Sequence, residues 1–526
     1  MSDVSRRLLG AVLLLLILSP FALAKEPACG PNDPHADVVA LDQPYWVNRL
    51  GAQMPQGIVY ALRRDVVPKN CYGANGQNCT AYGAMPALQP GYVMLRYGKR
   101  PRPIVLRVNE GQCLHISLYN ALPNPQLKMP PSAFPVTNDV SVHVNGLELV
   151  GSVASDGSFV GANASSLVAP GQSIQYTLYA AHEGVYLLYS MGSDFNAIGG
   201  GAQMGQANNG LFGSVIVEPN DAETYRSQVT REELLTLGAK HAGGKIELTP
   251  IGQPLIDYDA RYPASDPYTP CFPVFHMQAA PMKVSGGKCV ADPGAGNVYY
   301  SDLTAIITGP KRGNFTGTGP SFDKNPAEPM RREPYREFVI HYHELITAVQ
   351  PFPSFYKSLG NVYGTAADEF AINYGSNGIT NETVANRLGV GPEKDCTDCK
   401  FEEFFLSSWT VGDPAQITDW PADTTKLHPP TAVLYGDDPS NVYHSYLNDH
   451  VKFRILHAGG NLTHIHHQHA HQWMHSPNND NSAYLDSQLI SPGSAYTLEI
   501  DYNGSGNRNR TIGDSIFHCH FYPHFA

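Results

Sequence analysis

The sequence predicts an all-β protein made of sandwich or barrel domains joined by an irregular linker. Short runs of β-branched and aromatic residues recur along the chain, and glycine and proline separate them. Glycine (49 residues) and proline (42 residues) are abundant without a fixed period, which excludes collagen and indicates many turns. Long stretches of helical periodicity are scarce. These observations together favour β domains in tandem.

The strands predicted in the first half follow one another closely. Residues 105–120 read VLRVNEGQCLHISLYN, which is two β-rich runs around a Glu-Gly turn. Residues 173–179 and 184–189 alternate or run apolar in the same way, and residues 211–217 form another short buried strand. We therefore predict a first β domain over residues 37–220.

The texture of the sequence changes between the two halves. Residues 309–326 are rich in Gly, Pro, Thr and Asn, so we interpret residues 221–334 as a linker or irregular insertion. Strand signals resume at residues 336–341 (REFVIH) and continue to the C-terminus, interrupted by one short predicted helix at 383–388. We predict a second β domain over residues 335–526.

The composition limits the functions open to the chain. Hydrophobic residues make up 42% and charged residues 16%, which excludes a wholly disordered protein. The formal net charge of −12 repels phosphate backbones, so we expect no nucleic-acid partner.

Residues 1–24 have the pattern of a secretory signal peptide. Arg6 and Arg7 form a basic segment, and residues 8–18 form an apolar one. A small-residue cleavage site, Ala-Leu-Ala, follows at residues 22–24. The alternative is a membrane anchor, but the apolar run is short for a bilayer span. We expect an exported, periplasmic or secreted protein with no stable membrane span.

Cysteine usage agrees with an oxidising compartment. Eight cysteines are able to pair in up to four disulfides, whose connectivity the sequence leaves open. They are Cys29, Cys71, Cys79, Cys113, Cys271, Cys289, Cys396 and Cys399. The last two form a CxxC, but no second CxxC completes a zinc site, so we favour a local disulfide there. A ninth residue, Cys519, stands apart between two histidines.

Histidine is concentrated near the C-terminus. Residues 457–526 contain ten of the 21 histidines, where even spacing would give about three. One cluster is HIHHQHAH at residues 464–471, and the other is HCH at residues 518–520, followed by His524. Two ordered clusters, one of them centred on a cysteine, indicate a metal site.

The alternation of side chains along a strand divides these residues between two faces. His467, His469 and His471 share one face, and His518 and His520 point away from Cys519. A cysteine thiolate with two imidazoles is the ligand set of a blue electron-transfer copper, and the imidazoles on the opposite face suit further copper ions. The alternatives are a histidine-rich zinc or nickel sink and incidental surface histidines.

These clusters resemble the two C-terminal motifs of the multicopper oxidase family. The pattern H-x-x-H-x-H-x-H begins at His464 and ends at His471, and the pattern H-C-H-x-x-x-H begins at His518. The resemblance implies cupredoxin-like Greek-key domains. It also implies that His464, Cys519 and His524 are the ligands of a type 1 copper.

The same resemblance implies a second group of copper ligands and an activity. It places His467 at a type 2 copper, and the type 3 pair at His469, His518 and His520. In such an oxidase a reducing substrate gives electrons to the type 1 copper. They then pass through Cys519 and its neighbours to a trinuclear cluster that reduces dioxygen to water.

The first domain resembles the family too, but it lacks the expected ligands. Residues 141–147 look like an H-x-H-G segment in which His143 is kept and Asn145 replaces the second histidine. Tyr189 and Met191 stand where a second H-x-H is expected. We therefore expect a cupredoxin-like domain without copper, in which His143 is packed or hydrogen-bonded.

The two C-terminal histidine motifs, together with a first domain that lacks the expected ligands, are similar to what is found in the long bacterial multicopper oxidases implicated in manganese oxidation. The family's axial type 1 residue lies five positions after the last histidine ligand, which here is His524, and the chain stops at Ala526. The chain also has half of the histidines that a trinuclear cluster takes. We expect a C-terminally incomplete second domain in a fragment of a longer protein, with the missing ligands supplied by further domains or another subunit.

Two questions stay open at the level of sequence. The reducing substrate is Mn(II), another metal ion or a phenol, and the alternative function is a non-enzymatic periplasmic copper-binding or electron-transfer protein. His341 and His343 share one face of a predicted strand. They are either an accessory copper motif or an ordinary strand face.

Overall fold

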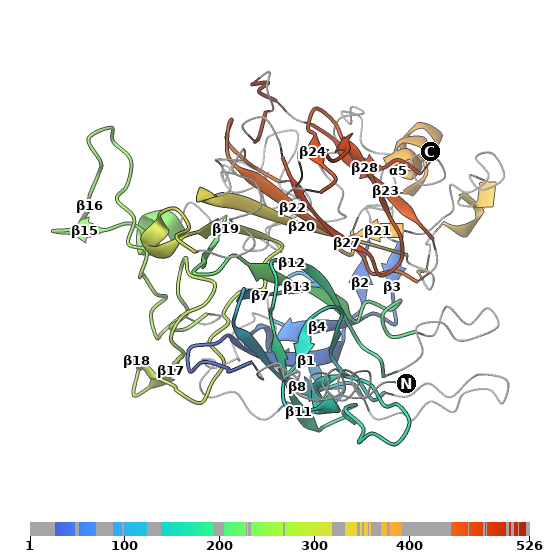
Figure 1. Ribbon diagram of the computed structural model, residues 1–526, viewed down its shortest axis with the longest axis horizontal. Helices are drawn as coiled ribbons and strands as arrows, with labels where there is room; N and C mark the ends of the chain where they lie inside the picture. Colours follow the sequence, from blue (N-terminus) through green and yellow to red (C-terminus); the bar gives the residue numbers. More distant parts are fainter. Residues whose placement is uncertain are drawn as a thin grey trace, which may run out of the picture.

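The structure is a computed structural model, shown in Figure 1, and it describes the following parts of the chain. These are residues 27–47, 52–69, 88–96, 99–123, 138–192, 205–227, 229, 233–266, 269–317, 332–344, 348–349, 352–355, 357–358, 370–375, 379–391, 443–460, 462–476, 479, 481–500, 504–506, 510–513 and 515–521. The predicted signal peptide, four of the cysteines (Cys71, Cys79, Cys396 and Cys399) and His524 lie outside them.

The first half of the chain forms a β-sandwich of two sheets, drawn in blue and green in the lower part of Figure 1. One sheet has the order β10-β11-β8-β1-β4. Its strands are β1 (His35–Asp42), β4 (Ile58–Leu62), β8 (Cys113–Asn120), β10 (Glu148–Leu149) and β11 (Ser173–Tyr179). The other sheet has the order β7-β13-β12-β9. Its strands are β7 (Ile104–Asn109), β9 (His143–Val144), β12 (Gly184–Tyr189) and β13 (Phe212–Glu218).

Alternating burial explains why these segments are strands. In β8 the side chains of Leu114, Ile116 and Leu118 are buried, while the residues between them are partly exposed. They meet apolar residues of the second sheet, such as Leu106 and Val215, in a shared core. The strands predicted for this half of the chain are all present.

Residues 223–519 contain another sandwich, drawn from green through yellow and orange to red in Figure 1. Its larger sheet has the order β14-β19-β20-β22-β27, with β21 paired to β20. Its strands are β14 (Glu223–Arg226), β19 (Thr304–Thr308), β20 (Tyr335–Glu344), β21 (Phe370–Ile372), β22 (Val451–His457) and β27 (Ala495–Glu499). The smaller sheet has the order β26-β23-β28. Its strands are β23 (His464–Gln468), β26 (Ser487–Ile490) and β28 (Phe517–Cys519).

A compact core lies under the smaller sheet. Phe338, Ile455 and Trp473 are buried there together with Cys519. Burying side chains of this size stabilises a fold by roughly 1.5–3 kcal/mol each. The cysteine of the HCH motif therefore belongs to the hydrophobic core rather than to the surface.

The remaining elements are short. The stretch predicted as a linker, 221–334, contributes β14 and β19 to the larger sheet, so it holds more regular structure than its composition indicates. Paired short strands make up most of the rest. They are β2 (Tyr45–Trp46) with β3 (Gln53–Met54), β5 (Val66–Pro68) with β6 (Val93–Leu95), β15 (His241–Ala242) with β16 (Lys245–Ile246), β17 (Met282–Ser285) with β18 (Lys288–Ala291), and β24 (Trp473–Met474) with β25 (Tyr484–Leu485). Helix α5 (Ile379–Leu388) contains the predicted helix.

A buried network of charges joins the two sandwiches. Arg107 of the first sandwich and Arg454 of the second each donate from Nε to Glu337, at 2.9 and 3.0 Å. Glu183 accepts from Arg454 and from Lys452. Burial alone would raise the pKa of Glu337, but the two guanidinium groups hold that pKa below its usual range. The pairing offsets the cost of burying these charges at the interface.

The structure is all-β, with sandwiches in tandem, and this confirms the predicted fold class. Two disulfides are present in the described residues, Cys29–Cys113 and Cys271–Cys289. No helix among the described residues is long and apolar enough to cross a membrane.

Candidate metal centre

The two histidine clusters predicted from the sequence lie on neighbouring strands. β23 and β28 pair antiparallel, with His466 opposite Cys519 and His467 opposite His518. The pleat turns Cys519 into the core, whereas His518 and His520 are partly exposed. Three consecutive residues thus divide between the interior and the outer face, as the alternation predicted.

The inward-facing residues of these strands bring a thiol and an imidazole together. Cys519 Sγ lies 3.6 Å from His464 Nδ1, and both residues are buried. The backbone N–H of Ile465 donates to the same sulfur atom at 3.4 Å. The ring of Phe370 packs 5.5 Å from that of His464. The third predicted ligand of this site, His524, lies outside the described residues.

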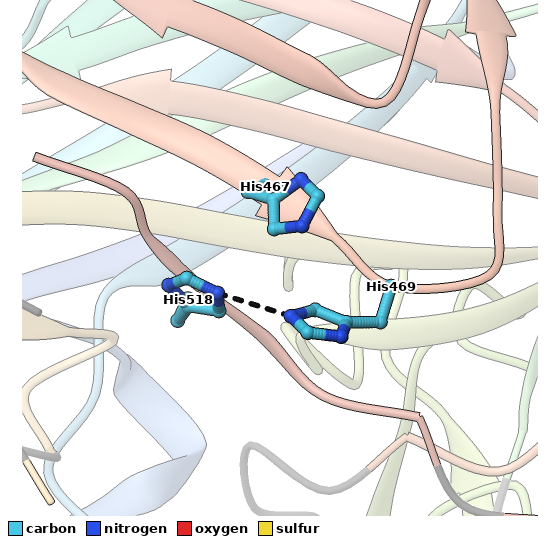
Figure 2. Close-up of side chains that lie close together, drawn as sticks. All are labelled: His467, His469 and His518. Atoms are coloured by element: carbon cyan, nitrogen blue, oxygen red, sulfur yellow. Dashed lines mark hydrogen bonds between the residues drawn. The ribbon is translucent and has the colours of Figure 1, made fainter.

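The outward-facing residues form a cluster of four imidazoles. His467, His469 and His518 each offer a ring nitrogen within 4.8 Å of the others, and Figure 2 shows their rings gathered at one point. The ring of His520 lies 5.2 Å from that of His467 and 5.5 Å from that of His518. The structure therefore brings together all four residues predicted to bind type 2 and type 3 copper.

Backbone carbonyls fix which nitrogen these rings present. His467 Nδ1 donates to the carbonyl of Asp486 at 2.9 Å, and His518 Nδ1 donates to the carbonyl of Cys519 at 3.1 Å. Each ring therefore carries its lone pair on Nε2. His518 Nε2 lies 3.2 Å from His469 Nε2 (Figure 2). Such bonds to the far nitrogen are typical of histidines that bind metal.

The imidazoles of the cluster are biased toward the neutral form. Burial, together with the neighbouring imidazoles, lowers the pKa of His518 to about 4. Burial also lowers the pKa of His469, and the neighbouring imidazole of His467 lowers it as well. A neutral imidazole has the free lone pair that a metal needs.

His471 lies apart from this cluster, although its motif position is regular. β23 ends at Gln468 and a turn at residues 469–470 follows, so the strand alternation that predicted His471 on the face of His467 and His469 does not extend to it. Its Nδ1 donates to the carbonyl of His469 at 2.9 Å, and its Nε2 accepts from the N–H of Gly506 at 3.2 Å. Both ring nitrogens are thus engaged within the protein.

The accessory motif at His341 and His343 lies inside the protein and is hydrogen-bonded there. His341 Nδ1 donates to Asn373 Oδ1 at 2.8 Å, and its Nε2 accepts from Ser214 Oγ at 3.1 Å. His343 Nε2 accepts from the N–H of Tyr374 at 3.1 Å. These bonds favour the ordinary strand interpretation over an accessory copper motif.

The first sandwich places its degenerate motif as expected. His143 Nδ1 donates to the carbonyl of Asp156 at 2.6 Å, and its ring packs 5.3 Å from that of Tyr189. Met191 is 38% exposed, and the N–H of Asn145 is bonded to the backbone. His143 is therefore hydrogen-bonded, as predicted.

Three buried residues beside the thiol site were missed by the sequence reasoning. His466 Nδ1 accepts from the hydroxyl of Tyr342 at 2.9 Å. Glu344 and His457 lie beside His464, with ligand atoms within 4.8 Å of one another. Burial raises the pKa of Glu344, but its bonds to the surrounding imidazoles dominate and hold that pKa at about 2. The sequence signal for this group was Glu344, a carboxylate directly after the H-x-H of His341 and His343 on one predicted strand.

The donor set fits copper. A thiolate with imidazole is a soft combination that suits copper, whereas magnesium and calcium require oxygen ligands. The four outward imidazoles suit copper, zinc or nickel. The buried thiol beside His464 therefore favours copper over the harder metals.

Comparisons with known proteins gave matches among solved structures. No protein-family model matches the chain. No curated protein matches it. Among solved structures, the multicopper oxidase mgLAC is 14% identical with a TM-score of 0.37, covering 93% of this chain and 80% of its own. The copper nitrite reductase from Nitrosomonas europaea is 14% identical with a TM-score of 0.36, covering 93% and 89%.

A third structure, the blue copper oxidase from Nitrosomonas europaea, is 12% identical with a TM-score of 0.36 and covers 93% of this chain and 80% of its own. All three of these structures are of copper proteins. The role of each residue here is inferred from the geometry of its own site.

Proposed function

We propose that the chain is a copper-dependent oxidase with two linked metal sites. The observation that supports it is the position of Cys519, whose thiol lies in the core 3.6 Å from His464 while its two neighbours lie in the outer imidazole cluster. Residues 518–520 therefore connect the two sites covalently. Copper would supply one-electron transfer at the thiolate and, as a trinuclear cluster, the four-electron reduction of dioxygen to water.

The residues of the chain have distinct tasks in this proposal. Cys519 and His464 bind the type 1 copper, with His524 as the third ligand, and the surrounding core excludes water from the thiolate. His467 binds the type 2 copper. The type 3 pair is held by His469, His518 and His520. Further domains or another subunit complete the trinuclear site.

We also propose that the protein is exported and that a metal ion or a phenol is its reducing substrate. The two disulfides support an exported protein, because such bonds persist in oxidising compartments. The reducing substrate is Mn(II), another metal ion or a phenol.

Oxygen uptake tests the proposal. The copper-loaded protein is given a phenol or Mn(II) in separate reactions, and dioxygen consumption is followed with an oxygen electrode. Uptake that requires copper and is absent in the zinc-loaded protein supports an oxidase. Equal uptake by the metal-free protein would contradict it.

One observation favours the alternative of a non-enzymatic copper-binding or electron-transfer protein. In the described residues of the first sandwich, the motif region offers a single histidine, and His143 is already bonded to Asp156. The alternative predicts a protein that turns blue with copper and exchanges electrons with a reductant but consumes no dioxygen.

A further inference from the structure

A buried carboxylate lies on the far side of His464 from the thiol. Glu344 is the last residue of β20, which runs parallel to β22 with Tyr342 opposite His457. Its side chain is 2% exposed. The Oε1 atom accepts from the N–H of Leu462 at 2.8 Å and lies 3.6 Å from His464 Nε2.

The arrangement does not suit a separate metal site built on Glu344 and the two histidines beside it. His457 Nδ1 accepts from the N–H of Gly459 at 3.0 Å, and its Nε2 donates to the carbonyl of Leu462. Both nitrogens of His457 are therefore engaged, one by Gly459 and the other by Leu462. A metal at this point would have to break one of these bonds.

The negative charge of Glu344 beside Nε2 favours a proton on that nitrogen of His464. An imidazole whose Nε2 faces a carboxylate keeps the hydrogen on Nε2 and the lone pair on Nδ1. His464 Nδ1 is the atom that lies 3.6 Å from Cys519 Sγ. The lone pair of His464 and the thiol thus face the same point.

The position of the carboxylate is tightly constrained. A Cβ atom added at Gly459 would lie 1.6 Å from Glu344 Oε2, so only glycine leaves room for this oxygen. Oε2 is buried and has no hydrogen-bond partner among the described residues. Its negative charge is therefore poorly screened by water and acts strongly on a charge nearby.

We infer that Glu344 is a positioning residue that orients His464 toward Cys519 and lowers the reduction potential of copper bound there. The inference rests on the proposed function, because it assigns the thiol site to copper. A fixed negative charge near the metal favours the more positive oxidised ion over the reduced one. The same charge, 3.6 Å from His464 Nε2, favours one tautomer and one orientation of the ligand ring.

Two substitutions separate the orienting effect from the charge. Glu344→Gln keeps an oxygen that accepts from the N–H of Leu462 and faces His464 Nε2, but it removes the charge. Glu344→Leu removes both. The matched control is Glu499→Gln, because Glu499 also pairs with a buried histidine, His450, at 2.7 Å. In the sheet, Glu499 lies opposite Lys452 of β22, and Lys452 is about 17 Å along that strand from His457. The control residue therefore lies away from the thiol site.

The first readout is the tautomer of His464 in the metal-free protein, from the nitrogen shifts of labelled histidine. We expect the Nε2–H form in the parent, in Glu344→Gln and in Glu499→Gln, and a mixture of tautomers in Glu344→Leu. A parent protein with the proton on Nδ1 would overturn the inference, whether or not the protein binds copper.

The second readout is the potential and the affinity of the copper-loaded protein. We expect Glu344→Gln to stay blue with an upward shift in reduction potential, and Glu344→Leu to bind copper about 10–100-fold more weakly. The control should match the parent in both. An unchanged potential in Glu344→Gln would overturn the electrostatic part of the inference. If the parent protein never turns blue with copper, the proposed copper site is refuted, and the inferred effect on its reduction potential is refuted with it. The tautomer of His464 still tests the orienting role of Glu344 in that case.

Discussion

Cys519 and His464 are 55 positions apart in the sequence, yet the sulfur of one lies 3.6 Å from Nδ1 of the other. β23 and β28 pair antiparallel and bring these residues together on the buried face of the smaller sheet. The same pairing gathers the outward imidazoles on the opposite face. One strand pair thus positions both parts of the candidate centre.

Copper bound at the thiol site should make the protein blue. Copper bound by Cys519 should absorb strongly in the visible range through charge transfer from sulfur, which imidazole ligands alone do not provide. We expect Cys519→Ser to lose this absorption while the circular dichroism of the fold is kept. A variant as blue as the parent would show that another group binds the copper.

Copper content should depend on the second sandwich and not on the first. His143→Ala removes a histidine that is bonded to Asp156, so we expect its copper content, measured by elemental analysis, to equal that of the parent. His467→Ala is the matched comparison and should lose copper, because His467 lies in the outer cluster. Loss of one copper equivalent from folded His143→Ala would place a ligand in the first sandwich.

The sequence predicted the parts of the site that follow from local alternation. The division of Cys519 from His518 and His520 required only the two-residue period of a strand. Glu344 and His457 could not be found in this way, because the parallel pairing of β20 and β22 brings them together across more than a hundred residues. Such register depends on the whole core rather than on either strand alone.

A similar limit explains the stretch between the domains. Residues 309–326 contain abundant glycine and proline, and this composition predicts a linker or irregular insertion over residues 221–334. Thr304–Thr308 is only five residues long, and it is a strand because β14 and β20 flank it. A strand this short gives little periodic signal of its own.

The buried His341 predicts a dependence of stability on pH. Burial lowers its pKa from 6.5 to about 3, so below pH 6.5 the unfolded chain binds a proton that the folded chain does not. Stability should therefore fall as the pH drops. Between about pH 7 and about pH 5, we expect His341→Gln to lose about 2 kcal/mol less than the parent in the metal-free state, measured by urea unfolding. Parallel losses in the two proteins would contradict the lowered pKa.

The charge network between the sandwiches predicts a large effect of one arginine. Arg454→Met removes the cation that contacts Glu183, Glu218 and Glu337, and it leaves buried carboxylates without their main partner. We expect a loss of about 3–5 kcal/mol in unfolding free energy, seen as a lower urea midpoint. Lys452→Met, whose ammonium group pairs with Glu183, should cost less. An unfolding midpoint equal to that of the parent would refute a stabilising role for the network.

We propose that the strand pair β23 and β28 binds copper on both of its faces. Anomalous X-ray scattering at the copper absorption edge, from crystals of the copper-loaded protein, tests it most directly because it locates the metal itself. We expect one copper between Cys519 and His464 and further copper within the cluster of His467, His469, His518 and His520. Anomalous peaks confined to other parts of the molecule, or no ordered copper at the thiol, would contradict it.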